Sequence, residues 1–257
     1  MPNETRTIDL NADVGESFGA WPMGHDREIM PFITSANVAC GGHAGDPNVM
    51  AATVRLAASH GVSVGAHPGY PDLAGFGRRA MAFSPEEVRH FVLYQVGALW
   101  AIGRACGIEL RHVKPHGALY NMAARDRATA EAIAGAVRDF SRELPLMCLA
   151  GSLAEEVSRD IGLPTLAEGF ADRAYEPGGV LRDRKLPGSV HHDAATVAEQ
   201  VVGLAGGELR TVDGSTLRVQ VDTICLHSDT PAAALFAQVA RQALEEAGFR
   251  VAAPKYS

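Results

Sequence analysis

Polar and titratable side chains recur just after short apolar runs along this 257-residue sequence. They are Asn11, Asp13 and Glu16, then His43, His67, Lys114 and His116, and finally Glu168, His227 and Asp229. Histidine and carboxylate side chains are suited to general acid–base catalysis or to metal coordination. A lysine two residues before a histidine would point to the same side and could stabilise an oxyanion or hold a carboxylate. The pattern indicates a catalytic or binding site assembled from several strands.

Each of these positions also has a structural interpretation. Asp9, Asn11 and Asp13 alternate on one face of the first run,. A solvated position is favoured for Asp9, near the strand start, and a functional role for Asn11 and Asp13. His43 follows a glycine pair that could simply form a tight turn, and His67 could be a core histidine bonded to a carbonyl. For both histidines a functional role is favoured.

Further residues could bind a substrate. Arg78 could clamp a carboxylate with two hydrogen bonds, although surface arginines are common,. Arg173, shortly after Glu168, is either a substrate contact or a salt-bridge partner. His227 and Asp229 follow the last apolar run, where Asp229 could instead cap the final helix,.

The apolar runs are short and rich in Val, Ile and Leu, which is typical of buried parallel strands. They predict strands at 7–14, 36–40, 62–67, 111–115, 145–150, 164–169 and 222–228. Helices are expected to begin after Asp46, after Ser84 with Glu87 as a capping box, and after Thr230, and to stop near Gly61 and Gly107,. A long loop is expected at 171–193 and a hairpin at 208–220, turning at Asp213-Gly214,.

Strands that alternate with helices form either a barrel or an open doubly wound sheet. Polar groups follow nearly every predicted strand, and in a barrel these ends converge on one mouth. An open sheet would concentrate them at one switch point. We therefore expect an α/β fold, an irregular seven-stranded TIM-like β/α barrel, with residues 1–257 as a single domain.

Composition excludes several classes of protein. The net charge of −7 argues against nucleic-acid binding,. There is no apolar run long enough for a membrane span and no signal-peptide pattern, so we expect a cytoplasmic protein with no membrane partner,. The four cysteines form no CxxC pair, and no Walker A, GxGxxG, HExxH or GxSxG motif is present,.

Six stretches, in this order along the chain, resemble the family of 5-oxoprolinase A subunits, also called LamB/YcsF. They are DLNADVGE (9–16), NVACGGHAGD (37–46), GAHPGYPD (65–72), VKPHGALYN (113–121), AEGFADRAY (167–175) and CLHSD (225–229). The resemblance implies a barrel like that of glycoside hydrolases and sugar deacetylases. It also implies cleavage of 5-oxo-L-proline to L-glutamate, coupled to hydrolysis of ATP with Mg, together with partner subunits B and C.

Under this resemblance the catalytic candidates are Asp13, His43, His67, Lys114 and His116. The substrate-binding candidates are Asn11, Arg78, Glu168, Arg173, His227 and Asp229. Barrel deacetylases use an aspartate and two histidines, so Asp13, His43 and His67 could hold a divalent transition metal such as zinc, manganese or cobalt. Two alternatives stay open: a metal-dependent amidohydrolase or carbohydrate deacetylase that needs no ATP, and a non-catalytic ligand-binding subunit.

Overall fold

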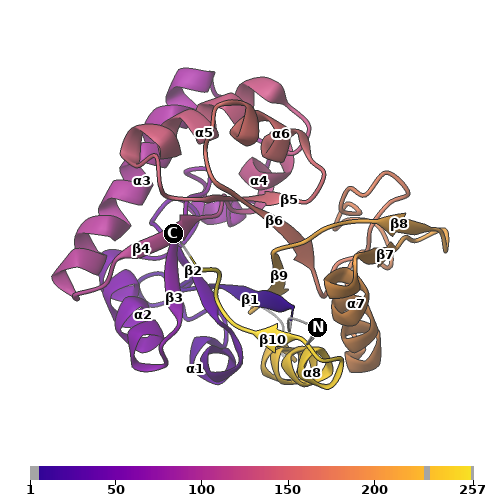
Figure 1. The fold of residues 1–257 in the computed structure, drawn as a ribbon. Coiled ribbons are helices and arrows are strands. Elements are labelled where there is room, and N and C mark those ends of the chain that lie inside the picture. The colour runs from indigo at the N-terminus through magenta and orange to yellow at the C-terminus, as the bar shows by residue number, and fades with distance from the viewer. Residues whose placement is uncertain (1–5, 229–231, 256–257) are drawn as a thin grey trace.

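The predicted apolar runs are the strands of a closed parallel barrel in a computed structural model that describes residues 6–228 and 232–255 (Figure 1). The barrel strands are β1 (Thr7–Val14), β2 (Ser35–Ala39), β3 (Ser63–His67), β4 (Leu110–Val113), β5 (Leu146–Leu149), β6 (Thr165–Phe170) and β9 (Thr223–His227). Each strand pairs in parallel with the next, and β9 pairs with both β6 and β1. This closure confirms the seven-stranded barrel and rules out the open sheet.

Helices surround the barrel on its outside (Figure 1). They are α1 (Asp26–Ile29), α2 (Pro47–Ser59), α3 (Pro85–Ala105), α4 (Gly117–Ala123), α5 (Arg127–Phe140), α6 (Leu153–Asp160), α7 (Ala194–Gly206) and α8 (Ala233–Glu246), with 3-10 turns η1 (Met30–Phe32) and η2 (Leu73–Gly75). Asp46 caps α2, and Ser84 with Glu87 forms the predicted capping box of α3. The predicted helix start at Thr230 lies outside the described residues, and α8 begins at Ala233.

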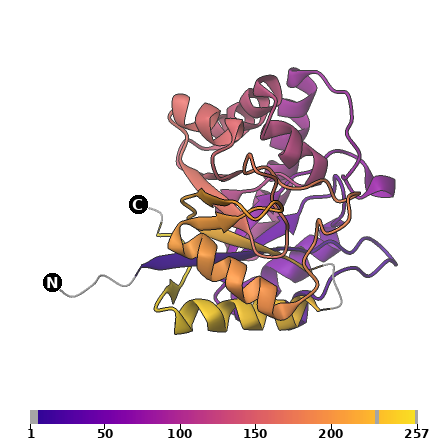
Figure 2. The same ribbon diagram turned by 90° about the vertical axis from the view of Figure 1, so that its right-hand side faces the viewer.

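Three further strands lie outside the barrel. The predicted hairpin is formed by β7 (Glu208–Arg210) and β8 (Thr216–Arg218), which pair antiparallel. The short β10 (Arg250–Val251) pairs with the beginning of β1. The long segment 171–193 contains only isolated bridges, and Figure 2 shows it on the side of the barrel opposite the beginning of β1. In the described part of the chain, no helix is long and apolar enough to cross a membrane.

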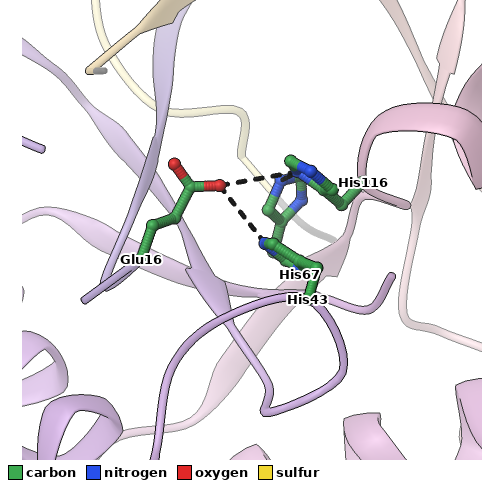
Figure 3. A group of neighbouring side chains, drawn as sticks. All are labelled: Glu16, His43, His67 and His116. Carbon is green, nitrogen blue, oxygen red and sulfur yellow. Dashed lines mark hydrogen bonds and ion pairs between the residues drawn. The ribbon is translucent and has the colours of Figure 1, made fainter. Parts of the chain in front are cut away.

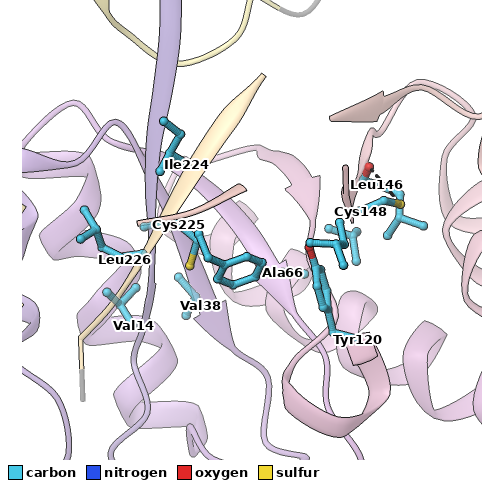
Figure 4. Close-up of a cluster of buried hydrophobic side chains, with 14 of the residues drawn as sticks. Val14, Val38, Ala66, Tyr120, Leu146, Cys148, Ile224, Cys225 and Leu226 are labelled. Atoms are coloured by element: carbon cyan, nitrogen blue, oxygen red, sulfur yellow. Dashed lines mark hydrogen bonds between the residues drawn. The ribbon is translucent and has the colours of Figure 1, made fainter. Parts of the chain in front are cut away.

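The strands separate an apolar outer layer from a polar interior. Along β1, the residues Ile8, Leu10, Ala12 and Val14 belong to the apolar core, whereas the alternate residues face inward,. Figure 4 shows part of this apolar layer, to which Val14, Val38 and Leu226 contribute from three strands. The inward-facing polar side chains therefore lie beneath the strand-end residues and contact them.

The position of Asp9 differs from the expectation. It is only 1% exposed, and its carboxylate accepts hydrogen bonds from Thr34, Ser35 and Thr223. The prediction of a solvated Asp9 is therefore wrong, because a strand that enters a barrel with a polar interior buries its inward residues from the start. Burial raises the pKa of Asp9 to about 6,.

Candidate active site

A buried ion cluster lies inside the barrel, between side chains from β1 and β6 and the residue that follows β4. The Nζ atom of Lys114 lies 2.9 Å from Oδ1 of Asp13 and 2.9 Å from Oε1 of Glu168. It also contacts Sγ of Cys225 at 2.9 Å and Oδ1 of Asn11 at 3.3 Å. The ammonium group is thus surrounded by acceptors from several strands, which offset the cost of burying its charge.

The electrostatics of this cluster favour its charged forms. Burial alone would lower the pKa of Lys114, but Asp13, Cys225 and Glu168 hold it well above its ordinary value. Burial alone would raise the pKa of Asp13, but the charges of His67 and Lys114 hold it well below its ordinary value. Asp13 is therefore a carboxylate and Lys114 an ammonium group at neutral pH.

Three histidines and one glutamate lie close together (Figure 3), and one of them, His67, contacts Asp13. Oε1 of Glu16 lies 3.2 Å from Nε2 of His43 and 3.5 Å from Nδ1 of His116. Nε2 of His67 lies 3.0 Å from Nδ1 of His116 and 3.3 Å from Oδ2 of Asp13. One potential ligand atom from each of Glu16, His43, His67 and His116 lies within 4.8 Å of the others, so this group could hold a metal ion.

Burial shapes the protonation of two of these rings. Desolvation and the neighbouring His67 lower the pKa of His43 well below its ordinary value. Desolvation, with His43 and His67 nearby, does the same for His116. Both rings are therefore neutral imidazoles at pH 7, the form that accepts a proton or binds a metal.

The turn that contains η2 covers the histidines. Phe76 adopts a left-handed backbone with φ of 53°, which is strained for a non-glycine residue, and its carbonyl lies 2.9 Å from Nε2 of His116,. Gly77 follows with φ of 60°, and a Cβ atom there would lie 2.7 Å from Cβ of His43 and 2.8 Å from Cδ2 of His116. Only glycine lets the backbone approach the rings this closely.

A cavity of about 470 Å³ opens above these groups, a size suited to a small ligand,. Asp13, Glu16, Lys114 and His116 contribute to its lining. Its other charged lining residues are mostly cationic, namely Arg78, Arg125, Arg173, Arg182, Asp183, Arg184 and Lys185. The cavity therefore combines a buried acid–base cluster with a cationic wall that favours anionic ligands.

The structure distributes the predicted substrate-binding residues over three places. Arg78, Arg173 and His227 line the cavity. Asn11 and Glu168 are fully buried beneath it, where the amide of Asn11 donates to Oε1 of Glu168. Asp229 lies outside the described residues.

Arg173 and His227 are themselves held by the protein. The guanidinium of Arg173 donates to the backbone carbonyls of Ser189 and Arg182, which fastens the segment 171–193 over the cavity. Nδ1 of His227 lies 2.9 Å from the carboxylate of Asp172. The sequence predicted Arg173 to be either a substrate contact or a salt-bridge partner. Among the described residues, its side chain forms no ion pair, and it lines the cavity.

Several residues of the site were absent from the predicted set. Glu16 follows the first strand and ends the DLNADVGE motif, but the sequence pattern predicts no particular role for it. Its place depends on Gly15, whose φ of 69° turns the chain back towards the histidines. Asp172 stands in the AEGFADRAY motif, and Arg125, Arg182, Arg184 and Lys185 carried no distinguishing signal in the sequence.

The fold and the placement of the site define a class, the TIM-like β/α barrels with polar groups at the carboxyl ends of their strands. The catalytic domain of a peptidoglycan N-acetylglucosamine deacetylase from Eubacterium rectale has this fold. Its TM-score is 0.53 at 10% identity, over 100% of this chain and 92% of that one.

The comparisons also identify the family. A profile of the LamB/YcsF family matches residues 8–256, and the chain belongs to this family, as its motifs predicted. It is 54% identical to the 5-oxoprolinase A subunit of Chloroflexus aggregans, over 97% of this chain and 99% of that protein. It is 51% identical to a lactam utilization protein from Thermus thermophilus, with a TM-score of 0.92, over 96% of this chain and 100% of that one.

Proposed function

We propose that this chain is the A subunit of an ATP-dependent 5-oxoprolinase, which opens the cyclic amide 5-oxo-L-proline to L-glutamate. Relatives that it matches over nearly their whole length are named as the A subunits of 5-oxoprolinases, which supports both the substrate and the need for further subunits. We propose subunits B and C as its partners, and the cytoplasm as the place where the assembly works.

One observation carries this proposal: the cavity joins a cationic wall to a buried carboxylate and histidine cluster. The substrate is a small carboxylate, and its phosphorylated form carries further negative charge. Arginine side chains bind both groups with paired hydrogen bonds. Arg78 is our candidate for the substrate carboxylate, because it lines the cavity close to the covering turn.

The chemistry explains why ATP is needed. Resonance stabilises an amide, so water attacks it slowly. Transfer of the γ-phosphoryl group from ATP, as its Mg complex, to the amide oxygen makes the ring carbon electrophilic. One water molecule then adds to this carbon, the C–N bond breaks as the nitrogen takes up a proton, and an acyl phosphate forms. A second water molecule releases phosphate and leaves L-glutamate.

The residues of this chain provide proton transfer and positioning. Asp13 lines the cavity as a carboxylate, and it accepts the proton of the attacking water and delivers a proton to the departing nitrogen,. A carboxylate with a low pKa is a weak base, but the activated carbon needs no stronger one. Lys114 keeps Asp13 ionised and lies next to the negative charge that develops during the addition,.

The test is glutamate release from 5-oxoproline by the purified chain, with and without ATP and with and without subunits B and C. We expect turnover only in the complete mixture with ATP. Asp13→Asn should lower kcat by about 10²-fold or more. The matched control is Asp139→Asn, which alters an exposed ion pair with Arg89 and should keep full activity.

Two results would overturn the proposal. One is no glutamate from a complete mixture whose components are each folded and assembled. The other is turnover without ATP, which would instead indicate the metal-dependent amidohydrolase or deacetylase.

A further inference from the structure

The orientation of two histidines in the Glu16 cluster is fixed by backbone carbonyl groups. Nδ1 of His67 lies 2.7 Å from the carbonyl oxygen of Lys114, and Nε2 of His116 lies 2.9 Å from the carbonyl oxygen of Phe76. A carbonyl oxygen only accepts hydrogen bonds, so these two nitrogens carry the protons. Unless a further proton or a cation is present, Nε2 of His67 and Nδ1 of His116 therefore carry lone pairs.

These two lone-pair nitrogens face each other at 3.0 Å. Two acceptors cannot form a hydrogen bond, so a positive species must lie between or beside them. The nearest additional oxygens are Oε1 of Glu16, 3.5 Å from Nδ1 of His116, and Oδ2 of Asp13, 3.3 Å from Nε2 of His67. The candidates are a proton shared between the rings and a cation bound by them.

The geometry favours a cation. Two ligand atoms about 2.1 Å from a tetrahedral zinc ion lie about 3.4 Å apart. Nδ1 of His116 lies 3.0 Å from Nε2 of His67 and 3.5 Å from Oε1 of Glu16, and all the potential ligand atoms lie within 4.8 Å of one another. The rings of His67 and His116 are nearly perpendicular, at 89°, so their planes intersect and can share one ion. Hydrogen bonds from the outer ring nitrogens to backbone carbonyls are the usual support of metal-binding histidines.

The same argument excludes His43 as a ligand together with His116. These two rings are parallel within 2° and their centroids lie 3.6 Å apart. A metal ion lies close to the plane of each imidazole that binds it, and two stacked planes share no such point. Nε2 of His43 instead lies 3.2 Å from Oε1 of Glu16, where it can donate a hydrogen bond and orient the carboxylate.

We propose that Glu16, His67 and His116 form a binding site for one divalent transition-metal ion, with His43 orienting Glu16. This set differs from the one expected from the sequence. The carboxylate whose oxygen lies within 4.8 Å of the ligand atoms of all three histidines is Glu16 and not Asp13, and His43 is stacked on a ligand. Two histidines and a carboxylate suit zinc, cobalt or manganese and leave a coordination position open. Glu16 and His116 line the cavity, so the open position faces it.

The use of such an ion rests on the proposed function, whereas its binding does not. When bound, it would supply a Lewis acid at the floor of the cavity, beside Asp13. Its binding can be measured on the isolated chain without substrate, ATP or partners. A chain that binds the ion but fails to open the lactam refutes the proposed function alone, and an active chain that binds no ion refutes this inference alone.

The experiment titrates the chelator-treated chain with Co²⁺ and with Zn²⁺. Visible absorption of bound Co²⁺ and calorimetry with Zn²⁺ report stoichiometry and affinity. We expect one ion per chain, and a loss of affinity of about 100-fold or more in His116→Gln and in Glu16→Gln. His43→Gln should lower the affinity for the ion by about 10-fold, as expected for a residue that orients a ligand. The control His60→Gln changes an exposed histidine at the end of α2 and should bind like the parent chain.

Asp13→Asn decides between the two ligand sets. Our assignment expects this variant to retain the ion, and circular dichroism of each variant verifies that it is folded. Loss of the ion in Asp13→Asn with retention in Glu16→Gln would overturn the assignment in favour of Asp13, His43 and His67. If the parent chain shows no saturable binding of Co²⁺ or Zn²⁺, the proposed metal site is wrong. The explanation for the close contact of His67 and His116 would then be a proton shared between the two rings.

Discussion

Lys114 is the cation on which the interior of the barrel depends. Replacing it with methionine removes the positive charge that lies 2.9 Å from both Asp13 and Glu168, whose side chains are 8% and 0% exposed. The two carboxylates then remain in the interior without the ammonium group that lies between them. Breaking a buried pair in this way costs about 3–5 kcal/mol, because the remaining charge is not solvated. We expect Lys114→Met to lower the free energy of unfolding by that amount.

The assay is urea unfolding monitored by circular dichroism, and the control is Arg127→Met. Arg127 forms ion pairs with Glu131 and Glu156, but all three side chains are about half exposed. An exposed pair contributes less than about 1 kcal/mol, so the control should change little. The double variant Lys114→Met/Glu168→Gln removes one of the stranded charges and should recover part of the loss.

The pH dependence has a definite sign. In the parent chain the pKa of Asp13 is held low, so its contribution to stability is present near neutral pH and is lost only as the pH falls through that low value,. Without Lys114, the interaction with His67 is the main one that still opposes the effect of burial, so this pKa rises and the folded state binds a proton more readily than in the parent,. The cost of Lys114→Met should therefore be larger at about pH 8 than at about pH 5. An effect equal to that of Arg127→Met, or one independent of pH, would refute the reasoning.

Three further predictions concern other parts of the fold. The pKa of Asp9 is raised to about 6, so the folded chain binds a proton more tightly than the unfolded chain. As the pH falls from about 7.5 to about 5, the free energy of unfolding of the parent should rise by about 1 kcal/mol relative to that of Asp9→Asn. Urea unfolding curves of the two proteins that change equally with pH would contradict this. Gly77→Ala should lower the free energy of unfolding by about 1–3 kcal/mol and reduce activity, since its Cβ would contact two histidines of the site,. The control Gly178→Ala has open space around its Cβ and should change neither stability nor activity. Arg173→Met should speed limited proteolysis of the long segment that Arg173 fastens, and unchanged cleavage relative to the exposed control Arg142→Met would argue against that role.

The strands were predictable because each is a short apolar run that ends in a polar residue. The strand predicted at 7–14 has the same bounds as β1. The hairpin predicted at 208–220 is also confirmed, because Asp213-Gly214 favours a tight turn between its two strands,. The single-sequence argument failed where burial depends on contacts between strands. The neighbours of Asp9 come from two other regions of the chain, Thr34-Ser35 and Thr223, so no local pattern indicated its burial.

The same limit applies to the site. Their positions at the ends of predicted strands placed Asp13 and His67 correctly at the mouth, because the carboxyl ends of barrel strands converge there,. Glu16 could not be assigned in this way, since it lies beyond the positive φ of Gly15, where alternation no longer applies. The cationic wall was also missed, because Arg182 and Arg184 belong to an irregular segment whose path only the folded chain defines.

The polar interior explains why the two oxygens of Asp13 differ. Hydrogen bonds connect Asp9 through Thr223 to Asn11, and Asn37 donates to both Asn11 and Oδ1 of Asp13. Lys114 also donates to Oδ1, so this oxygen is occupied by two donors from different strands. Oδ2 is left to face the histidine cluster and the cavity. The buried network beneath the site therefore fixes the orientation of the Asp13 carboxylate before any ligand binds, and this preorganisation would favour the proton transfer that we propose for it.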